Sequence, residues 1–418
     1  MEVLWAHKLT EANDLQAKIF HFEIIKDRVY VSSLNYLSIL DLKDLKALKN
    51  RRIGPQLDSP LCNYDSSSCL PGATPSLTDY VTKIMHTLPR GGLIVCATMK
   101  QGVCQIRSTD DLSILSNSSI TVAPNDIGAT CVSLVDSNSN LYVAATVTND
   151  SPYGGSIPLV STRKPPNYDI IGSGSLEGEA AVHIRTEYRS RFRVYFIAAF
   201  FHEHYVYYLS VQNKYLSNGR SPFTASKLIR ICRNEHRYIS YGEIEIQCHG
   251  IDDSNYNRAT AASLIDNKLI VAFADQNSQQ SAICVYKMEK IKLAFWYNID
   301  KCRVGIDSVG LPYIGRDNRC INKSHLPLAE NTCAMGVGGK IKCGQIASYE
   351  MNMIIKCMDV LPFFDTLIII IGTENAFIIQ LRGKRLSFSK YEQLKISAPI
   401  TAVKFVNGHY YLVIAGSK

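Results

Sequence analysis

One local pattern recurs along this chain and constrains its fold more than any other feature. A turn leads into a run of β-branched and aromatic residues, often followed by small or polar residues and a second such run. The seven copies are 43 to 98 residues apart and begin near Val29, Leu93, Leu141, Val194, Leu269, Leu367 and Tyr410. Strand–turn–strand units at this spacing are typical of β-propeller blades, which bury both faces only by packing against one another. The sequence therefore predicts an all-β, seven-bladed propeller, with residues 1–418 as a single domain.

The widest gap between copies, from Leu269 to Leu367, predicts an insertion. It holds a cluster of cysteines: Cys284, Cys302, Cys320, Cys333 and Cys343. We expect a disulfide-stapled insertion between the fifth and sixth strand repeats, and compact loops of this kind often carry function. Helical signals are weak elsewhere, although the alternation of leucine and lysine over residues 42–49 predicts about two amphipathic helical turns in a blade connector.

The cysteines and sequons favour an oxidising compartment. The chain has 13 cysteines without a C-x-x-C pair, which argues against zinc-ribbon and thioredoxin-like folds. Glycosylation sequons lie at Asn117, Asn149 and Asn322, the second hindered by the nearby Pro152. We therefore expect a disulfide-bonded extracellular protein rather than a cytosolic one with reduced thiols, and at least one free thiol because the count is odd.

Neither a membrane span nor a signal peptide is recognisable in the sequence. The longest apolar runs, near residues 194–201 and 367–371, are far shorter than the roughly 20 residues that cross a bilayer. Residues 1–20 lack the basic, apolar and small-residue regions of a secretory leader. Together with the cysteines, this predicts a fragment truncated at both ends, whose incomplete last blade would expose strand edges and lower its solubility.

The charge balance favours anionic partners. The net charge of +8 suits anionic surfaces such as glycosaminoglycans but is too weak to indicate nucleic acid. Arg189, Arg191 and Arg193 alternate, with Arg185 upstream. On a strand the alternating arginines would share one face and could bind sulfate groups or an acidic protein. The competing interpretation is a solvated edge strand guarded by charge.

Signatures of catalysis and of cofactor binding are missing. His202 and His204 would share a face on a strand and could hold a metal ion, but the sequence near them offers no third ligand, and an exposed hairpin tip is the preferred interpretation. The sequence has no Gly-x-Ser-x-Gly nucleophile elbow and no phosphate-binding loop. Scattered residues could still form a triad in space. We predict a protein that is not an enzyme and needs no cofactor.

A series of short motifs resembles the sema domain of plexins, the semaphorin receptors. Individually each motif is weak, whereas their order and spacing together are specific. They comprise residues 54–62 (GPQLDSPLC) followed by Cys69, 93–96 (LIVC), 101–104 (QGVC), 158–164 (PLVSTRK), 206–212 (VYYLSVQ), 229–233 (IRICR), Ser240-Tyr241 before Cys248, Cys320, 331–333 (NTC) and 372–373 (GT). The resemblance runs from about residue 20 to about residue 414, and the chain is similar to an invertebrate or divergent member of the family.

The resemblance implies a seven-bladed propeller and a set of disulfides. The pairs it implies are Cys62–Cys69, Cys96–Cys104, Cys232–Cys333, Cys248–Cys284 and Cys302–Cys320. Three cysteines remain. A Cys343–Cys357 bond is then an option, and Cys131 in an apolar strand would be a buried free thiol.

The resemblance also implies a role in recognition. It indicates the extracellular ligand-binding module of a plexin-like receptor that binds semaphorins in guidance or adhesion signalling, with a co-receptor or cis self-association as further options. Membrane attachment would come only from C-terminal regions beyond this chain. The implied ligand surface covers the outer faces of the third and fourth blades and the insertion, with candidates Arg163, Lys164, Ile321, Lys323 and His325. Two alternatives remain, namely a secreted decoy or matrix propeller that binds glycosaminoglycan through the Arg185–Arg193 row, and an intracellular scaffold.

Overall fold

The fold is described from a computed structural model of the chain. It describes residues 19–148, 157–216, 219–252, 254–306, 311–315, 320, 333, 336, 338–384, 387–406 and 410–416. The chain divides into two compact units, within Glu2–Tyr195 and Phe196–Ser417, which are treated separately below. The organisation of residues 1–418 as a single domain stays a prediction.

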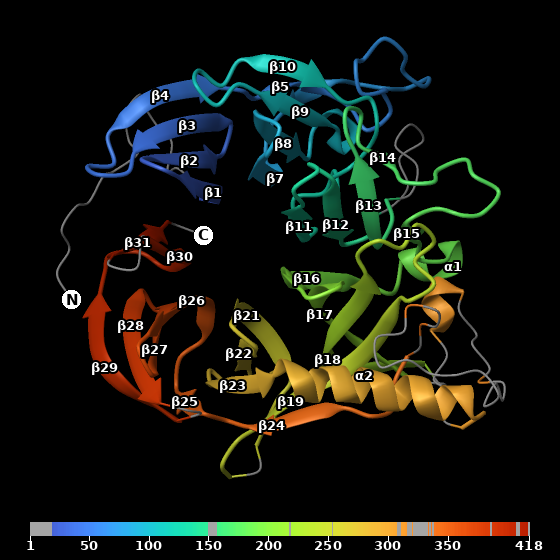
Figure 1. Cartoon of the computed structure of the whole chain (residues 1–418). Helices are drawn as coiled ribbons and strands as arrows, with labels where there is room; N and C mark the ends of the chain where they lie inside the picture. The colour runs from blue at the N-terminus through green and yellow to red at the C-terminus, as the bar shows by residue number, and fades with distance from the viewer. Residues whose placement is uncertain are drawn as a thin grey trace. The chain divides into compact units, whose positions relative to one another are not determined.

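The first unit contains three antiparallel sheets in succession (Figure 1). The first sheet comprises β1 (Ile19–Ile25), β2 (Arg28–Ser33), β3 (Tyr36–Asp41) and β4 (Ala47–Arg52). The second comprises β7 (Thr82–Thr87), β8 (Leu93–Ala97), β9 (Cys104–Arg107) and β10 (Ile114–Asn117), and a separate hairpin of β5 (Gln56–Asp58) and β6 (Ser76–Thr78) precedes it. The third comprises β11 (Cys131–Val135), β12 (Leu141–Ala145), β13 (Val160–Lys164), β14 (Asp169–Ile170) and β15 (Ala181–Val182). Two short helices, η1 (Lys100–Gly102) and α1 (Thr186–Arg189), lie in connections.

The second unit continues the series with four more sheets. The fourth comprises β16 (Val194–His202), β17 (Tyr205–Leu216), β18 (Gly219–Cys232), β19 (Gly242–His249) and β20 (Asn255–Tyr256), with β24 (Cys343–Ile346) also paired to β19. The fifth comprises β21 (Arg258–Ile265), β22 (Lys268–Ala274), β23 (Ser281–Lys287) and β25 (Tyr349–Met351). The sixth comprises β26 (Ile355–Phe363), β27 (Thr366–Thr373), β28 (Phe377–Lys384) and β29 (Ser387–Lys395), and β30 (Ile400–Val406) pairs with β31 (Tyr410–Ala415) in a two-stranded seventh. The helices here are α2 (Met288–Arg303) and η2 (Pro312–Ile314).

The recurring apolar runs of the sequence mostly correspond to the second strand of each sheet. Every residue of β8 and of β12 is buried, whereas every residue of the outer strand β10 is exposed. A strand reads as a continuous apolar run only when both of its faces are covered. The copy near Val194 is shifted by one strand and begins at β16, the first strand of its sheet.

Alternate residues of a second strand pack into different cores. In β22, Leu269, Val271 and Phe273 join one cluster with residues of the fourth sheet. The intervening Ile270 and Ala272 join another cluster with residues of the sixth sheet. Successive side chains of a strand point to opposite faces, so one strand connects two layers of core. Burial of such side chains contributes roughly 1.5–3 kcal/mol each.

The two helical turns expected over residues 42–49 are absent from the structure. Asp41 and Asp44 accept hydrogen bonds from the backbone N–H groups of Lys43 and Lys46, which closes a turn, and β4 then pairs with β3. Leu45 has a left-handed φ of 57°. The sheet supplies backbone hydrogen bonds that a two-turn surface helix would leave to water, so the helical prediction was wrong.

The structure contains the five disulfides that the resemblance implied. They are Cys62–Cys69, Cys96–Cys104, Cys232–Cys333, Cys248–Cys284 and Cys302–Cys320. The optional Cys343–Cys357 bond is not formed, because Cys343 lies in β24 of the fourth sheet and Cys357 in β26 of the sixth. Cys131 is a free, partly buried thiol in β11.

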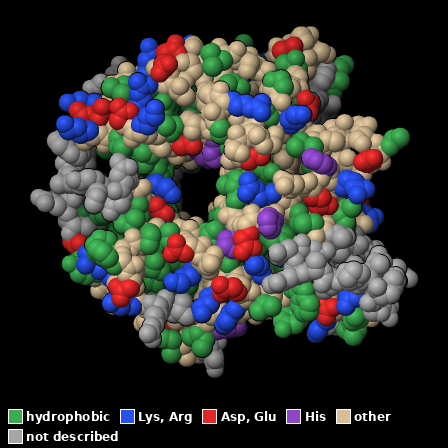
Figure 2. All heavy atoms as spheres, viewed as in Figure 1, with side chains coloured by type: hydrophobic (Ala, Val, Ile, Leu, Met, Phe, Trp, Pro, Cys, Tyr) green, Lys and Arg blue, Asp and Glu red, His purple; other side chains and the backbone are tan. Residues whose placement is uncertain are grey.

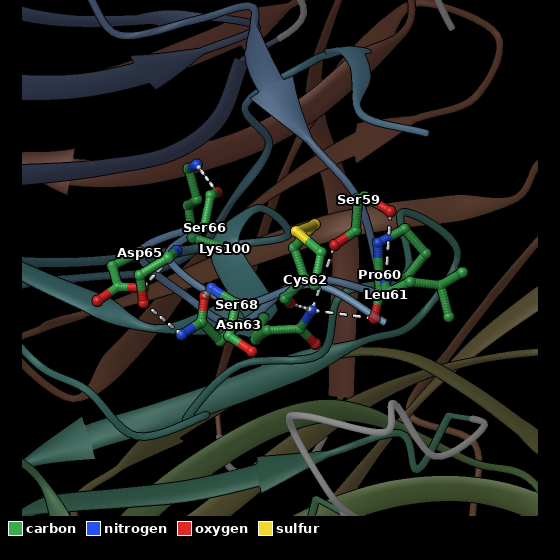
Figure 3. Close-up of a disulfide and its surroundings, with 12 residues drawn as sticks. Ser59, Pro60, Leu61, Cys62, Asn63, Asp65, Ser66, Ser68 and Lys100 are labelled. Atoms are coloured by element: carbon green, nitrogen blue, oxygen red, sulfur yellow. Dashed lines mark hydrogen bonds between the residues drawn. A yellow bond between two sulfur atoms is a disulfide. The ribbon is translucent and has the colours of Figure 1, made fainter. Parts of the chain in front are cut away.

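The Gln-Gly-Val-Cys motif holds the first disulfide loop. The Nε2 group of Gln101 donates to the backbone oxygens of Pro60, at 3.1 Å, and Cys62, at 2.5 Å. Lys100 Nζ donates to Ser66 Oγ at 2.8 Å on the other side of the loop (Figure 3). Gly102 has a φ of 74°, and a Cβ there would lie 1.9 Å from the oxygen of Ala123, so only glycine fits.

Among the helices of the described residues, none combines the length and the apolarity needed to span a membrane.

We predict that the native protein leaves its three free thiols unmodified at pH 8. Burial raises the pKa of Cys343 to about 11 and those of Cys131 and Cys357 to about 12, and the thiolate is the reactive form. Iodoacetamide followed by mass spectrometry should find no adduct on the folded chain and three after unfolding without reductant. Labelling of the native chain should accelerate as the pH rises toward about 11. Rapid labelling at pH 8 would contradict the burial of these thiols, and more than three adducts after unfolding would contradict the disulfide assignment.

Candidate functional site

The predicted insertion is a substructure built onto the fourth sheet. It leaves the fifth sheet at the end of β23, forms α2 and η2, and returns along the fourth sheet as β24, which runs parallel to β19. It then re-enters the fifth sheet as β25, which pairs with β23. The insertion therefore lies between the third and fourth strands of one blade, and it covers the outer part of the blade before it.

A buried carboxylate fastens the insertion to the sheet. Glu243 of β19 is 2% exposed. Its oxygens accept hydrogen bonds from Tyr241 Oη at 2.5 Å and from Gln212 Nε2 at 3.1 Å, and they pair with Lys227 Nζ at 2.9 Å. Tyr313 of η2 donates a further hydrogen bond to the same carboxylate. A buried charge is tolerated only with this degree of satisfaction, so the carboxylate fixes both the sheet and the insertion.

The helix α2 is anchored by an arginine and an asparagine. The guanidinium of Arg230, on β18, lies 4.3 Å from the ring centre of Tyr205 and 4.4 Å from that of Phe295 on α2. The side chain of Asn298 donates to the oxygen of Ile341 at 3.0 Å and accepts from the N–H of the same residue at 2.9 Å. These contacts join the helix to β18 and to the segment before β24, in addition to the apolar face that α2 buries.

The outer face of α2 is an exposed surface of mixed character. Leu293 is 45% exposed and Tyr297 is 48% exposed. Lys290 and Lys301 are exposed on the same face, because residues separated by three, four or eleven positions in a helix align. We call these four residues the α2 face. An aromatic and an aliphatic side chain between two lysines can contact an apolar surface with acidic groups around it.

The predicted ligand residues of β13 differ in accessibility. Arg163 is 1% exposed, and its guanidinium donates to Ser161 Oγ at 3.1 Å and to the backbone oxygen of Tyr168 at 3.2 Å. Its prediction as a ligand-surface residue was wrong, because this guanidinium serves the interior of the third sheet. Lys164, the next residue, is exposed. Asn117 is exposed on β10, whereas Asn149, Ile321, Asn322, Lys323 and His325 lie outside the described residues.

The arginines of the Arg185–Arg193 row do not share one strand face. Arg189 ends α1, and its Nε group donates to the backbone oxygen of Ile184 at 2.9 Å. Arg185 pairs with Glu187 at 2.5 Å, and Arg193 lies 3.8 Å from Asp126. Arg191 lies over the ring of Tyr188 at 5.0 Å. The expected strand was wrong because a helical turn precedes β16, and the anionic-patch prediction loses the geometry that supported it.

The His-Glu-His segment forms a turn beside α2. β16 ends at His202 and β17 begins at Tyr205, as expected for a hairpin tip. Glu203 pairs with Lys292 of α2 at 2.9 Å, and burial lowers the pKa of His202. The described residues contain no group of three or more His, Cys, Asp or Glu side chains able to hold a metal ion.

Ser133, His86 and Glu23 come together in a way that superficially resembles a catalytic triad. Ser133 Oγ lies 2.8 Å from His86 Nε2, and Nδ1 of the same histidine is 3.9 Å from Glu23 Oε1. That second distance is too long for a hydrogen bond, and the carboxylate accepts from the N–H of Thr87 at 2.6 Å instead. Ser133 lies mid-strand in β11, opposite Val143 of β12, and not on the sharp strand-to-helix turn that exposes a catalytic serine. The arrangement does not support catalysis.

A polar pocket of about 370 Å³ lies where the fourth sheet meets the turn between β22 and β23. Its lining is rich in amides and carboxylates and contains no basic residue: Ala225, Ser226, Glu245, Ile246, Gln247, Asn255, Tyr256, Asn257, Asp275, Gln276 and Asn277. This lining suits a cationic or hydroxyl-bearing group of a partner rather than an anion.

The sequence contains a helical pattern of apolar residues over α2, which the prediction from repeated strands did not take into account. The side chains that α2 buries recur at helical spacing: Met288, Ile291, Ala294, Phe295, Asn298, Ile299 and Cys302. This period indicates an amphipathic helix. Counting that period would have revealed the α2 face as well, because its four residues occupy the intervening positions.

Comparison with known proteins gives a consistent result. No protein-family model matches the sequence. The chain is 38% identical over 383 residues to Plexin-2 of Caenorhabditis elegans, an alignment that covers 89% of this chain and 21% of that protein. The chain thus spans about a fifth of the length of this curated relative.

Solved structures share the fold. The extracellular region of Plexin A4 matches 97% of this chain with a TM-score of 0.83 at 18% identity, covering 46% of that chain. A chain of the complex of Drosophila Plexin A with Semaphorin 1b matches 96% of this chain with a TM-score of 0.67 at 12% identity, covering 84% of that chain. These matches confirm the predicted β-propeller fold.

We predict that Glu243→Gln lowers the free energy of unfolding of the second unit by about 2–3 kcal/mol. A neutral amide accepts weaker hydrogen bonds than a carboxylate, and its NH₂ group would face the donors that now bind Glu243, among them Lys227 and Gln212. Urea unfolding followed by tyrosine and tryptophan fluorescence measures this loss. The matched control is Glu245→Gln on the same strand, whose partner Lys342 is at 3.3 Å and largely solvated. We expect the control to cost at most about 1 kcal/mol. Equal losses in the two variants would contradict the assigned role of the buried carboxylate.

Proposed function

The chain carries a sema domain of the plexin family, and from that premise we propose that it is the extracellular ligand-binding module of a semaphorin receptor. The observation that carries the proposal is the 38% identity with Plexin-2 over 89% of the chain. The resemblance extends to the disulfide framework, which suits an oxidising extracellular environment. Because the chain spans about a fifth of that relative, signalling by a whole receptor is part of the proposal.

The proposed activity is recognition without chemistry. A solved structure that shares this fold is a complex of Drosophila Plexin A with Semaphorin 1b, which supports a semaphorin as the partner class. The Ser133–His86–Glu23 arrangement lacks the histidine–carboxylate hydrogen bond of a catalytic triad, because His86 Nδ1 lies 3.9 Å from Glu23. A binding module for a protein ligand therefore accounts for this chain better than an enzyme does.

We place the proposed contact surface on the α2 face, and Lys164 of the first unit stays a separate prediction. Tyrosines that are half exposed on a rigid element are frequent energetic centres of protein interfaces. The α2 face is held in place by the Arg230 and Asn298 contacts described above, so it can bind without losing much conformational freedom. Lys290 and Lys301 would steer an acidic ligand and raise its association rate. Lys323, Ile321 and His325 remain predictions of ligand-surface residues.

We predict that Tyr297→Ala weakens semaphorin binding at least about tenfold, since loss of an interface tyrosine costs more than about 1.4 kcal/mol. The 418-residue chain, secreted and shown by size exclusion to be monomeric, is immobilised and tested by surface plasmon resonance against a panel of semaphorin ectodomains. The charge reversals Lys164→Glu and Lys323→Glu should mainly lower the association rate.

The matched control is Tyr391→Ala, which removes another exposed tyrosine, from β29 of the same unit. Binding by this control should equal that of the unaltered chain. If no semaphorin binds a folded preparation, the receptor proposal fails. If one binds and both tyrosine variants behave alike, the ligand class stands and the α2 face is not the contact surface.

A further inference from the structure

The outer edge of the first sheet carries a concentration of positive charge. β4 is the last strand of its sheet and, among the described strands, pairs only with β3. Five basic residues lie on it and on the turn before it: Lys43, Lys46, Lys49, Arg51 and Arg52. We call this set the β4 cationic edge. All but Arg51 are exposed, and Figure 2 shows Lys and Arg side chains gathered over the region labelled β4 in Figure 1.

The carboxylates around this edge are already engaged. Asp44 pairs with Lys46 at 2.8 Å, and Asp41 accepts from the backbone N–H of Lys43 at 2.7 Å. Asp110 lies 3.4 Å from Arg28, and hydrogen bonds from Ser113 and Ser108 lower the pKa of Asp111 to about 2. No ion pair is found for the side chains of Lys43 and Lys49 within the described part of the chain. Their charges are therefore directed to solvent and not used to neutralise the neighbouring acids.

The geometry of β4 suits an extended polyanion. Alternate residues of a strand lie on one side about 7 Å apart, so Lys49 and Arg51 face one way, while Arg52 faces the other and Lys43 lies in the turn at the strand's start. The cations thus follow a line along the strand instead of converging on one point. Single surface ion pairs are weak, and such a row binds only a ligand that carries several negative charges in series.

We propose that the β4 cationic edge is a binding site for a sulfated polysaccharide. Disulfides such as Cys62–Cys69 and Cys96–Cys104 in the same unit indicate an oxidising, extracellular setting, where linear polyanions are sulfated glycans and not nucleic acids. Sulfate groups are permanently anionic, and their oxygens accept hydrogen bonds from lysine and arginine. This site lies in the first unit and is independent of the proposed semaphorin contact on α2.

The same reasoning excludes the Arg185–Arg193 row as the main site. There Arg185 pairs with Glu187, Arg193 lies near Asp126, and Arg189 donates to a backbone oxygen. At the β4 cationic edge Arg52 likewise donates to the backbone oxygen of Gly54, but Lys43 and Lys49 have no ion pair among the described residues. The Arg185–Arg193 row therefore provides a matched control, because it lies in the same unit and its triple variant removes the same number of positive charges.

The test is heparin affinity of the 418-residue chain, measured by chromatography and by surface plasmon resonance over a range of NaCl concentrations. In the variant Lys43→Gln/Lys49→Gln/Arg52→Gln, we expect heparin affinity to fall at least about tenfold and its salt dependence to become shallower, because fewer counterions are released. The control variant Arg185→Gln/Arg191→Gln/Arg193→Gln should change affinity by less than about twofold. Thermal melts confirm that both variants are folded.

Two further probes sharpen the assignment. Heparosan, which has carboxylates but no sulfates, and poly-L-glutamate should both bind far more weakly than heparin. On the unaltered chain, heparin should protect Lys43, Lys46 and Lys49 from acetylation, as read by mass spectrometry. Equal losses in the two variants, no loss in either, unprotected lysines, or poly-L-glutamate binding as tightly as heparin would each overturn the proposal and leave β4 as a strand edge guarded by charge.

Discussion

The fold depends on strands that are buried on both faces. A sheet of four short strands cannot remain folded alone in water, because each of its faces exposes apolar side chains. In this chain the second strand of a sheet sends Leu269, Val271 and Phe273 to one neighbour and Ile270 and Ala272 to the other. Each sheet is thereby stable only in the presence of the next. Outer strands such as β4 do not need to be covered on both faces, so they can carry exposed polar residues that are available for recognition.

The insertion also depends on a neighbouring sheet for its stability. The described part of the insertion relies on the fourth sheet for partners, because α2 packs Met288, Ile291 and Phe295 into the core cluster that contains residues of that sheet. Glu243, buried in that sheet, requires donors, and Tyr313 of the insertion supplies one of them. The hydrogen bond between Tyr313 and Glu243 stabilises both partners, because it satisfies the buried carboxylate and also holds the insertion against the sheet. A surface such as the α2 face becomes rigid through polar contacts that lie beneath it, and not through the residues that it exposes.

Much of the fold was predictable because the apolar runs report burial directly. The copies at Leu93, Leu141, Leu269 and Leu367 each mark a strand covered on both sides. The disulfide pairs were predictable only through resemblance to a family, since spacing alone allows many connectivities.

The failures arose where tertiary contacts decide the outcome. Residues 42–49 have a helical pattern but complete a sheet edge, and Arg163 has the character of a surface residue but bonds to Tyr168 inside the third sheet. A charge in the sequence does not reveal whether its partner is solvent, a ligand or the backbone of its own sheet. The α2 face was missed for the opposite reason, because a helical period was present among residues assigned to a loop.

The place where the insertion joins the fifth sheet has a consequence for how such proteins diversify. The chain leaves after β23 and returns as β25, and these two strands are neighbours in register, with Ile283 opposite Tyr349. A loop whose ends are adjacent can change in length and content at little entropic cost to the structure that carries it. Exposed positions of the segment between them, such as the α2 face, can therefore change while the residues that satisfy Glu243 and pack on the fourth sheet are kept. The pairing of β23 with β25 lets the exposed surface of the insertion change without altering the strands of the blade.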